Sequence, residues 1–303
     1  MLLISLVLAQ TAPPIVNGST TRDFPQVGAL AAHAGGWFSF CSGTLIQSQW
    51  VLTAAHCNEA AEEYVQHGYP VSFVWGHDLR TSSGVDGYVR IDEILVHPDY
   101  DPQRMEFDVG LLHLKEPATD LDPMPVNREA MDDSWIDRDL DFVGWGVTSD
   151  NANNGGIKRT ARIPVYDIRS SSVFLAYDNQ RNLCSGDSGG AGLEPQENGR
   201  HEIAGVNSFV FAVQNGSSGC VGGGSGSTRV DTALEWIEGH VPLDELGFEV
   251  AGLDSAYVDT GDPVMPSENG VQPLGCGTGG GAAGWSFIAL AWLWRRPRGR
   301  ESG

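Results

Sequence analysis

The sequence predicts an all-β protein, and two observations support this fold class. Short apolar runs broken by Gly, Pro, Asn and Asp fill the middle of the chain. The 303 residues include 39 glycines, which favour a turn-rich β protein over a helical bundle. No repeat of fixed period is evident. With 41% hydrophobic residues there is enough material for a core, which excludes wholesale disorder. These observations alone do not distinguish a β-sandwich from a β-barrel.

The first element is a targeting segment. Residues 2–8 (LLISLVL) form an apolar run too short to span a bilayer, and small and polar residues follow it. This pattern predicts a signal peptide over residues 1–9, cleaved after Val7-Leu8-Ala9. The segment carries no Lys or Arg before the run, which departs from the usual pattern. A buried N-terminal strand is the alternative.

The strands expected next are the apolar runs that follow along the chain: 43–47, 50–56, 71–75, 90–97, 109–114, 141–147 and 202–211. A helix is expected over 228–241, because its apolar residues recur at helical spacing: Val230, Ala233, Leu234 and Ile237. Trp236 lies beside that face, and Pro242 ends the helix. We expect this helix to pack on the body of the domain.

Residues 242–274 are rich in Asp, Glu, Gly and Pro and nearly free of basic groups. They are predicted to be an acidic spacer. The segment also contains Leu246, Phe248 and Val250, so a small docked hairpin is the alternative.

The last element is a tail over residues 275–303. Gly275-Cys276-Gly277 precedes a short apolar stretch from Ala282 to Trp294, and the arginine cluster RRPRGR (295–300) follows. As a helix the stretch would be about 20 Å long, short against a bilayer core of about 30 Å. The arginines would stay cytoplasmic and leave the domain outside. An ordinary C-terminal anchor with an incidental cysteine is one interpretation.

The order of these three parts resembles the myxobacterial-type C-terminal sorting signal. The resemblance implies that a sorting peptidase cuts the tail near Gly275-Cys276 and that the protein is displayed on the bacterial cell surface. Cys276 would be the processing or lipidation site. This role would explain why the chain has five cysteines, an odd number.

The strongly negative net charge limits the classes of molecule that the chain could bind. The formal net charge is −21, and only two of the basic residues are lysines, Lys115 and Lys158. So acidic a chain is a poor candidate for binding nucleic acid or anionic lipid through its main body. We therefore expect no nucleic-acid partner, and membrane contact only through the tail.

Three short motifs carry chemistry. Gly186-Asp187-Ser188-Gly189-Gly190 places a serine between glycines, which permits a sharp turn and leaves backbone N–H groups free to face an oxyanion. His56 lies among small residues, and Asp108 heads an apolar run. A buried carboxylate needs hydrogen-bond donors, and an imidazole N–H is one. Each motif alone has a plainer explanation, as a loop, a structural histidine or a turn aspartate.

Together the motifs resemble the trypsin-like (chymotrypsin-fold) serine peptidases, in which the triad residues follow the same order of His, Asp and Ser. Further segments match in order over residues 15–241: Ile15-Val16-Asn17-Gly18, Cys41 to Cys57, His97-Pro98-Asp99-Tyr100 and Val143-Gly144-Trp145-Gly146. The resemblance implies two six-stranded antiparallel β-barrels of the trypsin-like type with a C-terminal helix.

The resemblance also implies roles for individual residues. Ser188 would attack the peptide carbonyl, His56 would take the serine proton and pass it to the leaving amine, and Asp108 would fix the histidine tautomer. Backbone N–H groups of Gly186 and Ser188 would form the oxyanion hole. Two disulfides, Cys41–Cys57 and Cys184–Cys220, would require an oxidising compartment.

Activation in this family pairs a freed N-terminal amine with the acid before the serine. By match, the Ile15 ammonium would pair with Asp187, which would otherwise be a buried acid without a partner. Signal removal after Ala9 leaves residues 10–14 (QTAPP) as a short pro-segment. Because Pro14 rather than Arg precedes Ile15, another peptidase is expected to trim it.

The residues matched to the substrate pocket are Asn182 at its base and Ser208, Phe209 and Val210 along its wall. Without a carboxylate at the base, selection for Arg or Lys loses its usual ion pair. Val210 would narrow the pocket. This predicts cleavage after small or medium apolar residues; acids elsewhere that attract a basic side chain are the alternative.

The leading hypothesis is a secreted, surface-anchored serine endopeptidase that acts on proteins or peptides as a monomer without a cofactor. One rival is a catalytically silent homologue that serves as a surface binding module, and another is an adhesin carried by the spacer. Some members of the family that the chain resembles bind calcium in the loop before the aspartate strand. By that resemblance Asp78 and Asp86 are candidate ligands, although His77 stands where an acid would be expected, and a solvated acidic loop is the alternative. No metal is assigned.

Overall fold

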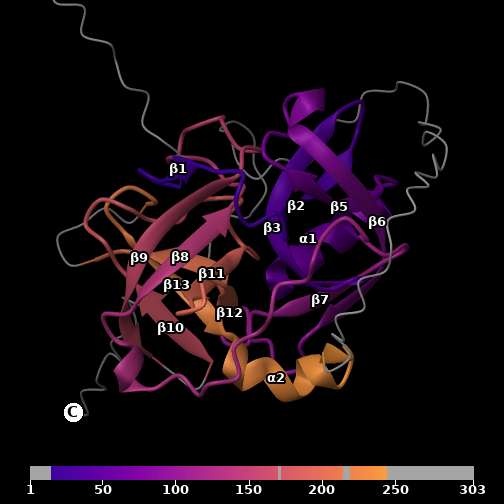
Figure 1. The fold of residues 1–303 in the computed structure, drawn as a ribbon. Coiled ribbons are helices and arrows are strands. Elements are labelled where there is room, and N and C mark those ends of the chain that lie inside the picture. Colours follow the sequence, from indigo (N-terminus) through magenta and orange to yellow (C-terminus); the bar gives the residue numbers. More distant parts are fainter. Residues whose placement is uncertain (1–14, 170–171, 214–218, 244–303) are drawn as a thin grey trace, which may run out of the picture.

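The computed structural model describes residues 15–169, 172–213 and 219–243. They form two β-barrels that lie side by side, with a helix beneath them (Figure 1). The predicted signal peptide, pro-segment and sorting tail, with all of the spacer after Leu243, lie outside the described residues. In the described part of the chain, no helix is long and apolar enough to cross a membrane.

The first barrel closes in the order β2-β3-β4-β7-β6-β5, with every neighbouring pair antiparallel. Its strands are β2 (Val27–His33), β3 (Trp37–Gln47), β4 (Trp50–Thr53), β5 (Val71–Gly76), β6 (Val85–Val96) and β7 (Gly110–Leu114). Exposure alternates along most of β6, as expected for a strand with one face toward the core.

The second barrel closes in the order β9-β10-β13-β12-β11-β8, because β8 also pairs with β9. Its strands are β8 (Asp139–Gly144), β9 (Arg159–Ile168), β10 (Val173–Ala176), β11 (Ala191–Pro195), β12 (His201–Phe211) and β13 (Gly224–Arg229). The short β1 (Ser19–Thr20) pairs with the start of β9. The prediction of two six-stranded antiparallel barrels is therefore confirmed.

One apolar core continues from the first barrel into the junction between the two. Buried side chains of the first barrel, such as Leu45 and Leu111, belong to the same cluster as Val143, Leu193 and Val206 of the second barrel. A second cluster fills the other barrel around Trp135, Leu140, Phe142, Ile163 and Phe174. Because the barrels share apolar packing, loops from both meet at the junction in fixed positions.

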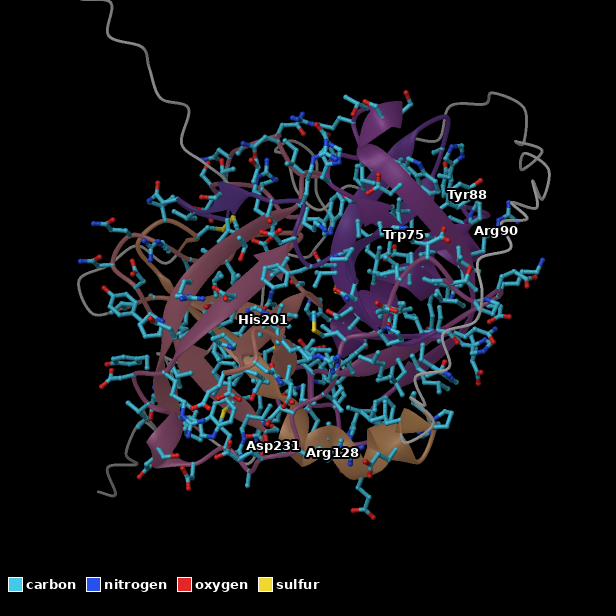
Figure 2. All side chains as sticks on the ribbon, in the orientation of Figure 1. Trp75, Tyr88, Arg90, Arg128, His201 and Asp231 are labelled. Carbon is cyan, nitrogen blue, oxygen red and sulfur yellow. A yellow bond between two sulfur atoms is a disulfide. The ribbon has the colours of Figure 1, made fainter. Side chains whose placement is uncertain are left out.

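The C-terminal helix α2 (Val230–Glu238) confirms the predicted helix but is shorter at both ends. It buries Val230, Ala233 and Ile237. The Asp231 carboxylate in its first turn accepts a hydrogen bond from the Met131 N–H at 3.0 Å, and Arg128 pairs with Glu238 in its last turn. Figure 2 shows Arg128 and Asp231 beside this helix.

A second helix, α1 (Ala55–Gln66), occupies residues that follow β4. The expected strand over 50–56 therefore ends early, at Thr53. Ala and Glu are abundant in this stretch, AHCNEAAEEYVQ, and both favour helix. His56 is thus the second residue of a helix.

Two basic side chains at the start of β9 are buried, each 1% exposed: Lys158 and Arg159. The Lys158 ammonium donates to the Phe24 carbonyl at 3.1 Å. Burial lowers the pKa of Lys158 to about 8, although Asp86 and Asp23 oppose the change. Of the two lysines in the chain, only Lys115 is exposed.

Candidate active site

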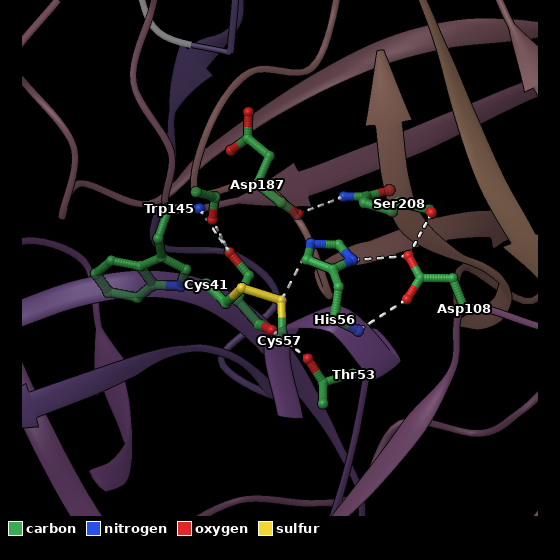
Figure 3. The surroundings of a disulfide bond; sticks show 11 residues. Cys41, Thr53, His56, Cys57, Asp108, Trp145, Asp187 and Ser208 are labelled. Atoms are coloured by element: carbon green, nitrogen blue, oxygen red, sulfur yellow. Dashed lines mark hydrogen bonds and ion pairs between the residues drawn. A yellow bond between two sulfur atoms is a disulfide. The ribbon is translucent and has the colours of Figure 1, made fainter. Parts of the chain in front are cut away.

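The first barrel supplies His56 and Asp108 to the junction. His56 lies at the start of α1, and Asp108 lies two residues before β7. His56 Nδ1 lies 2.8 Å from Asp108 Oδ2, and the His56 backbone N–H donates to Asp108 Oδ1 at 3.0 Å (Figure 3). Both carboxylate oxygens therefore hold the same histidine.

Burial and the neighbouring charge shift the pKa of each group in this pair in opposite directions. Asp108 is fully buried, and burial alone would raise its pKa. The ion pair with His56 and the hydrogen bonds from His56 and Ser208 have a larger combined effect in the other direction, so the pKa of Asp108 lies below its usual value. Burial likewise would lower the pKa of His56, but Asp108, and to a smaller extent Glu59, raise it above its usual value. The pair thus favours a carboxylate beside an imidazolium.

Two hydroxyl groups of the second barrel also donate hydrogen bonds to Asp108. The Ser208 hydroxyl on β12 donates to Asp108 Oδ2 (Figure 3), and the Thr228 hydroxyl on β13 donates to the Asp108 carbonyl at 3.0 Å. Sequence reasoning assigned Ser208 only to the substrate pocket and did not single out Thr228. Neither contact has a sequence signal of its own, because each depends on how the barrels meet.

Ser188 lies on the loop between β10 and β11, and Ser42 of β3 fastens that loop to the first barrel. The Ser42 N–H donates to the Ser188 carbonyl at 2.8 Å. The Ser42 hydroxyl donates to the Gly186 carbonyl at 2.8 Å and accepts from the Trp145 N–H at 3.0 Å. In the described part of the chain, no hydrogen bond joins the Ser188 hydroxyl to His56, whose Nε2 lies 3.7 Å from Cys57 Sγ.

The backbone around Ser188 exposes two donors. Gly186 has φ of 92°, a left-handed conformation that L side chains rarely adopt, which explains the glycine before Asp187. No described residue accepts a hydrogen bond from the N–H of Gly186 or of Ser188. Such a pair of free N–H groups can stabilise an oxyanion that develops beside the serine.

A cavity of about 190 Å³ opens beside Ser188. Its lining includes three of the predicted pocket residues, Ser208, Phe209 and Val210; the others are Leu183, Cys184, Ser185, Ser188 and Asn207. Asn182, predicted at the base, does not line it. Its side-chain amide donates to the Cys220 carbonyl at 3.0 Å, and its carbonyl accepts from the Val16 N–H at 2.9 Å, so it serves the neighbouring backbone instead.

The two residues of the predicted activation pair are both buried near this loop. Ile15 is 0% exposed within the second apolar cluster. The Asp187 carboxylate accepts from the Gly146 N–H at 2.8 Å and from the Cys184 N–H at 2.9 Å. Burial raises the pKa of Asp187 to about 7, although those hydrogen bonds and Arg159 oppose the rise. Among the described residues, none forms an ion pair with Asp187, and Ile15 is not hydrogen-bonded to it.

The cysteines form the two bridges that the resemblance implies: Cys41–Cys57 and Cys184–Cys220. The first joins β3 to α1 next to His56, and the second joins the Ser188 loop to the segment before β13. A bridge that closes a loop of about 16 residues stabilises the folded chain by about 3 kcal/mol on the chain-entropy model. Cys276 lies outside the described residues.

The candidate calcium ligand Asp78 is engaged by a neighbour. Arg80 donates to both of its carboxylate oxygens at 2.9 Å, which lowers the pKa of Asp78. Two other groups of potential metal ligands lie among the described residues, but each includes cysteines that are disulfide-bonded. The site as a whole consists of a loop serine at the barrel junction and a histidine that is hydrogen-bonded to a buried acid.

Comparison with known proteins agrees with this geometry. A family model described as trypsin matches residues 15–237. Chymotrypsin-like elastase family member 1 from Macaca fascicularis is 26% identical over 264 residues, covering 74% of this chain and 94% of the relative. The Felis catus protein of the same name is 29% identical with the same coverage. Vitamin K-dependent protein C from Rattus norvegicus is 31% identical over 205 residues, covering 60% of this chain and 43% of the relative.

Proposed function

We propose, from the premise that this chain belongs to the trypsin family of serine endopeptidases, that Ser188, His56 and Asp108 are its catalytic triad. The observation that carries the proposal is the 2.8 Å contact between His56 Nδ1 and Asp108 Oδ2, made next to the loop that presents Ser188. Family membership alone does not assign these residues, because a fold can keep its shape and lose its chemistry.

In the proposed reaction, Ser188 Oγ attacks the carbonyl carbon of the scissile peptide bond while His56 Nε2 takes its proton. Asp108 stabilises the imidazolium that forms and keeps the proton on Nδ1. The Gly186 and Ser188 N–H groups bind the oxyanion. His56 then protonates the leaving amine, and an acyl-enzyme remains until water, deprotonated by His56, hydrolyses the ester.

A fluorophosphonate probe tests this assignment directly, because it reacts with an activated serine in an assembled site. The full chain is made with a cleavage site directly before Ile15, cut, and incubated with the probe. Mass spectrometry of the digest should find the label on Ser188. A folded, disulfide-bonded protein that takes up no label would favour the silent binding module instead.

We also propose that the pocket selects small or medium apolar side chains before the cut. Val210 and Leu183 place branched apolar groups in a cavity of only about 190 Å³, and no carboxylate lines it. Two of the relatives are named elastases, which fits the same preference.

The variant Val210→Gly should widen this cavity. Relative to an alanine substrate, kcat/KM for a phenylalanine substrate is expected to rise about tenfold or more, since a single methylene is worth roughly 1–3 kcal/mol in an apolar pocket. A peptide library with a varied residue before the cut measures the preference. Val221→Gly is the matched control, because Val221 is exposed and lies outside the cavity. Predominant cleavage after Arg or Lys in the wild type would contradict the proposal.

The pH profile should report the raised pKa of His56. Only the neutral imidazole can accept the serine proton, so kcat/KM should be low in acid and rise with pH, with a midpoint above 6.5. Replacing Glu59 by Gln removes a negative charge that favours the imidazolium, so the midpoint should move to lower pH. This variant also distinguishes His56 from Asp187, because Glu59 contributes to the pKa shift of His56 and not to that of Asp187. A midpoint below 6.5 in the wild type would contradict the expectation.

We propose further that residues 1–9 direct secretion and that 10–14 are removed. A sorting peptidase would cut the tail of residues 275–303 near Gly275-Cys276, so that Cys276 and the spacer 242–274 attach the domain of residues 15–241 to the cell surface. The two disulfides support an oxidising compartment. Intact-mass analysis of protein from the cell surface would locate both processed ends. A mature chain that keeps residues 277–303 would contradict processing at Cys276.

A further inference from the structure

A buried arginine outside the triad has an unusual set of partners. Arg159 Nη1 donates to the Gly146 carbonyl at 3.1 Å and to the Ile157 carbonyl at 2.7 Å, and Nη2 donates to the Asn154 carbonyl at 3.1 Å. In the described part of the chain it makes no ion pair. Its guanidinium therefore donates hydrogen bonds to the backbone of one segment, residues 146–157, which connects β8 to β9.

Hydrogen bonds rather than apolar packing keep that segment in shape. Backbone bonds contribute, because the Val147 N–H donates to the Ser185 carbonyl and the Gly156 N–H donates to the Trp145 carbonyl, both at 2.9 Å. Residues 148–156 (TSDNANNGG) contain no large apolar side chain, so packing cannot define their conformation. Thr148 and Asn154 bond to each other, and the Asp150 carboxylate accepts from the Cys220 N–H at 3.0 Å. The fixed fork of a guanidinium can bind several carbonyls at once, which a lysine ammonium does less well. The buried guanidinium of Arg159 thus binds the segment from its inner side, through three backbone carbonyls.

Gly146 bonds both to Arg159 and to the loop that carries Ser188. Its carbonyl accepts from Arg159, and its N–H donates to Asp187 Oδ1 at 2.8 Å. A Cβ on Gly146 would lie 2.5 Å from the Ser185 carbonyl oxygen and 2.6 Å from the Asp187 nitrogen. The two backbones are therefore in direct contact, and a shift of Gly146 must move Asp187 or the Gly186 peptide next to it.

We infer that Arg159 is a positioning residue for the peptidase reaction: by holding the carbonyls of residues 146–157 it fixes Gly146 against Asp187 and keeps the Gly186 and Ser188 N–H groups aimed at the oxyanion. The inference rests on the proposed function. Charge acts in the same direction, because Arg159 opposes the rise in the pKa of Asp187 caused by burial and so favours the carboxylate that accepts both N–H groups.

The test uses the full chain cut before Ile15 and compares Arg159→Met with the wild type. The kcat for a peptide amide is expected to fall about a hundredfold, the size of loss that a small misplacement of reacting groups can cause, with KM within about twofold. Affinity for a peptide boronate, whose tetrahedral adduct on Ser188 occupies the oxyanion hole, should fall in parallel with kcat. Arg159→Lys should recover part of both losses, because it keeps the charge.

Arg162→Met is the matched control. Arg162 also lies on β9, but its side chain is 53% exposed and pairs with Asp141 on the surface, so its kcat should stay at the wild-type value. Circular dichroism and thermal unfolding establish that each variant is folded. Wild-type kcat and boronate affinity in folded Arg159→Met would overturn the inference; if that variant does not fold, wild-type values in Arg159→Lys would do so. An inactive wild type would overturn the proposed function and the inference together.

Discussion

Replacing Ser188 by Ala is expected to lower kcat for peptide hydrolysis on the order of 10⁶-fold, because the reaction loses its nucleophile and with it the acyl-enzyme route. The remaining rate should still exceed that of the uncatalysed reaction by roughly 10³- to 10⁴-fold, since the Gly186 and Ser188 N–H groups still bind the oxyanion. Single-turnover hydrolysis of a chromogenic amide, followed over hours, measures such a rate.

The fold should survive this substitution. The Ser188 hydroxyl makes no hydrogen bond among the described residues, and only the backbone carbonyl of Ser188 is tied to Ser42. The melting temperature should therefore stay close to that of the wild type. Ser83→Ala is the control, because Ser83 is exposed on the first barrel, and it should keep full activity. A Ser188→Ala protein with wild-type turnover would mean that the nucleophile is another residue.

Replacing Asp108 by Asn is expected to lower kcat roughly 10⁴-fold. An amide NH₂ cannot accept the proton of His56 Nδ1, so the histidine would carry its proton on Nε2 and could not take one from Ser188. The amide also adds a donor where His56 and Ser208 already donate. Steady-state kinetics on the alkaline plateau of the wild-type pH profile, where the imidazole is neutral, measures the loss.

Asp101→Asn is the matched control for this experiment. Asp101 lies on the same connection between β6 and β7, but its side chain is 41% exposed and faces Arg104. It should keep wild-type kcat. An Asp108→Asn variant with a near-normal rate on that plateau would show that His56 is oriented by other contacts, and the proposed triad would then be wrong.

Particular strands show what the sequence could and could not reveal. Runs such as 71–75 and 109–114 were predictable because their apolar residues form a core face. β13 (GSGSTR) was not, because its residues are small and polar. It is a strand because it pairs with β10 on one side and β12 on the other. The rings of Phe209 and Phe211 lie over Gly226 and Gly224, where a Cβ would come within about 2.4 Å of them. Such a strand is defined by its neighbours rather than by its own composition.

The site divides in the same way. The sequence singles out His56, Asp108 and Ser188 because each lies within a short motif of distinctive composition, and the structure places them on elements that meet at the barrel junction. Their catalytic roles stay a prediction. Asn182 was placed in the pocket by counting from the serine, but its side chain bonds to the Cys220 carbonyl. The contacts of Ser208 with Asp108 and of Arg159 with Gly146 join residues about 100 and 13 positions apart, and no local pattern marks either pair.

The burial of Lys158 has a practical consequence for handling the protein. Because the other lysine is Lys115, reagents that acylate primary amines should modify one side chain, apart from the amino terminus. Lys115 directly follows β7, and Asp108 precedes the same strand, so at about 3.3 Å per residue the two lie roughly 20 Å apart. Coupling through Lys115 would therefore attach every molecule to a solid support in one orientation, with the barrel junction away from the point of attachment.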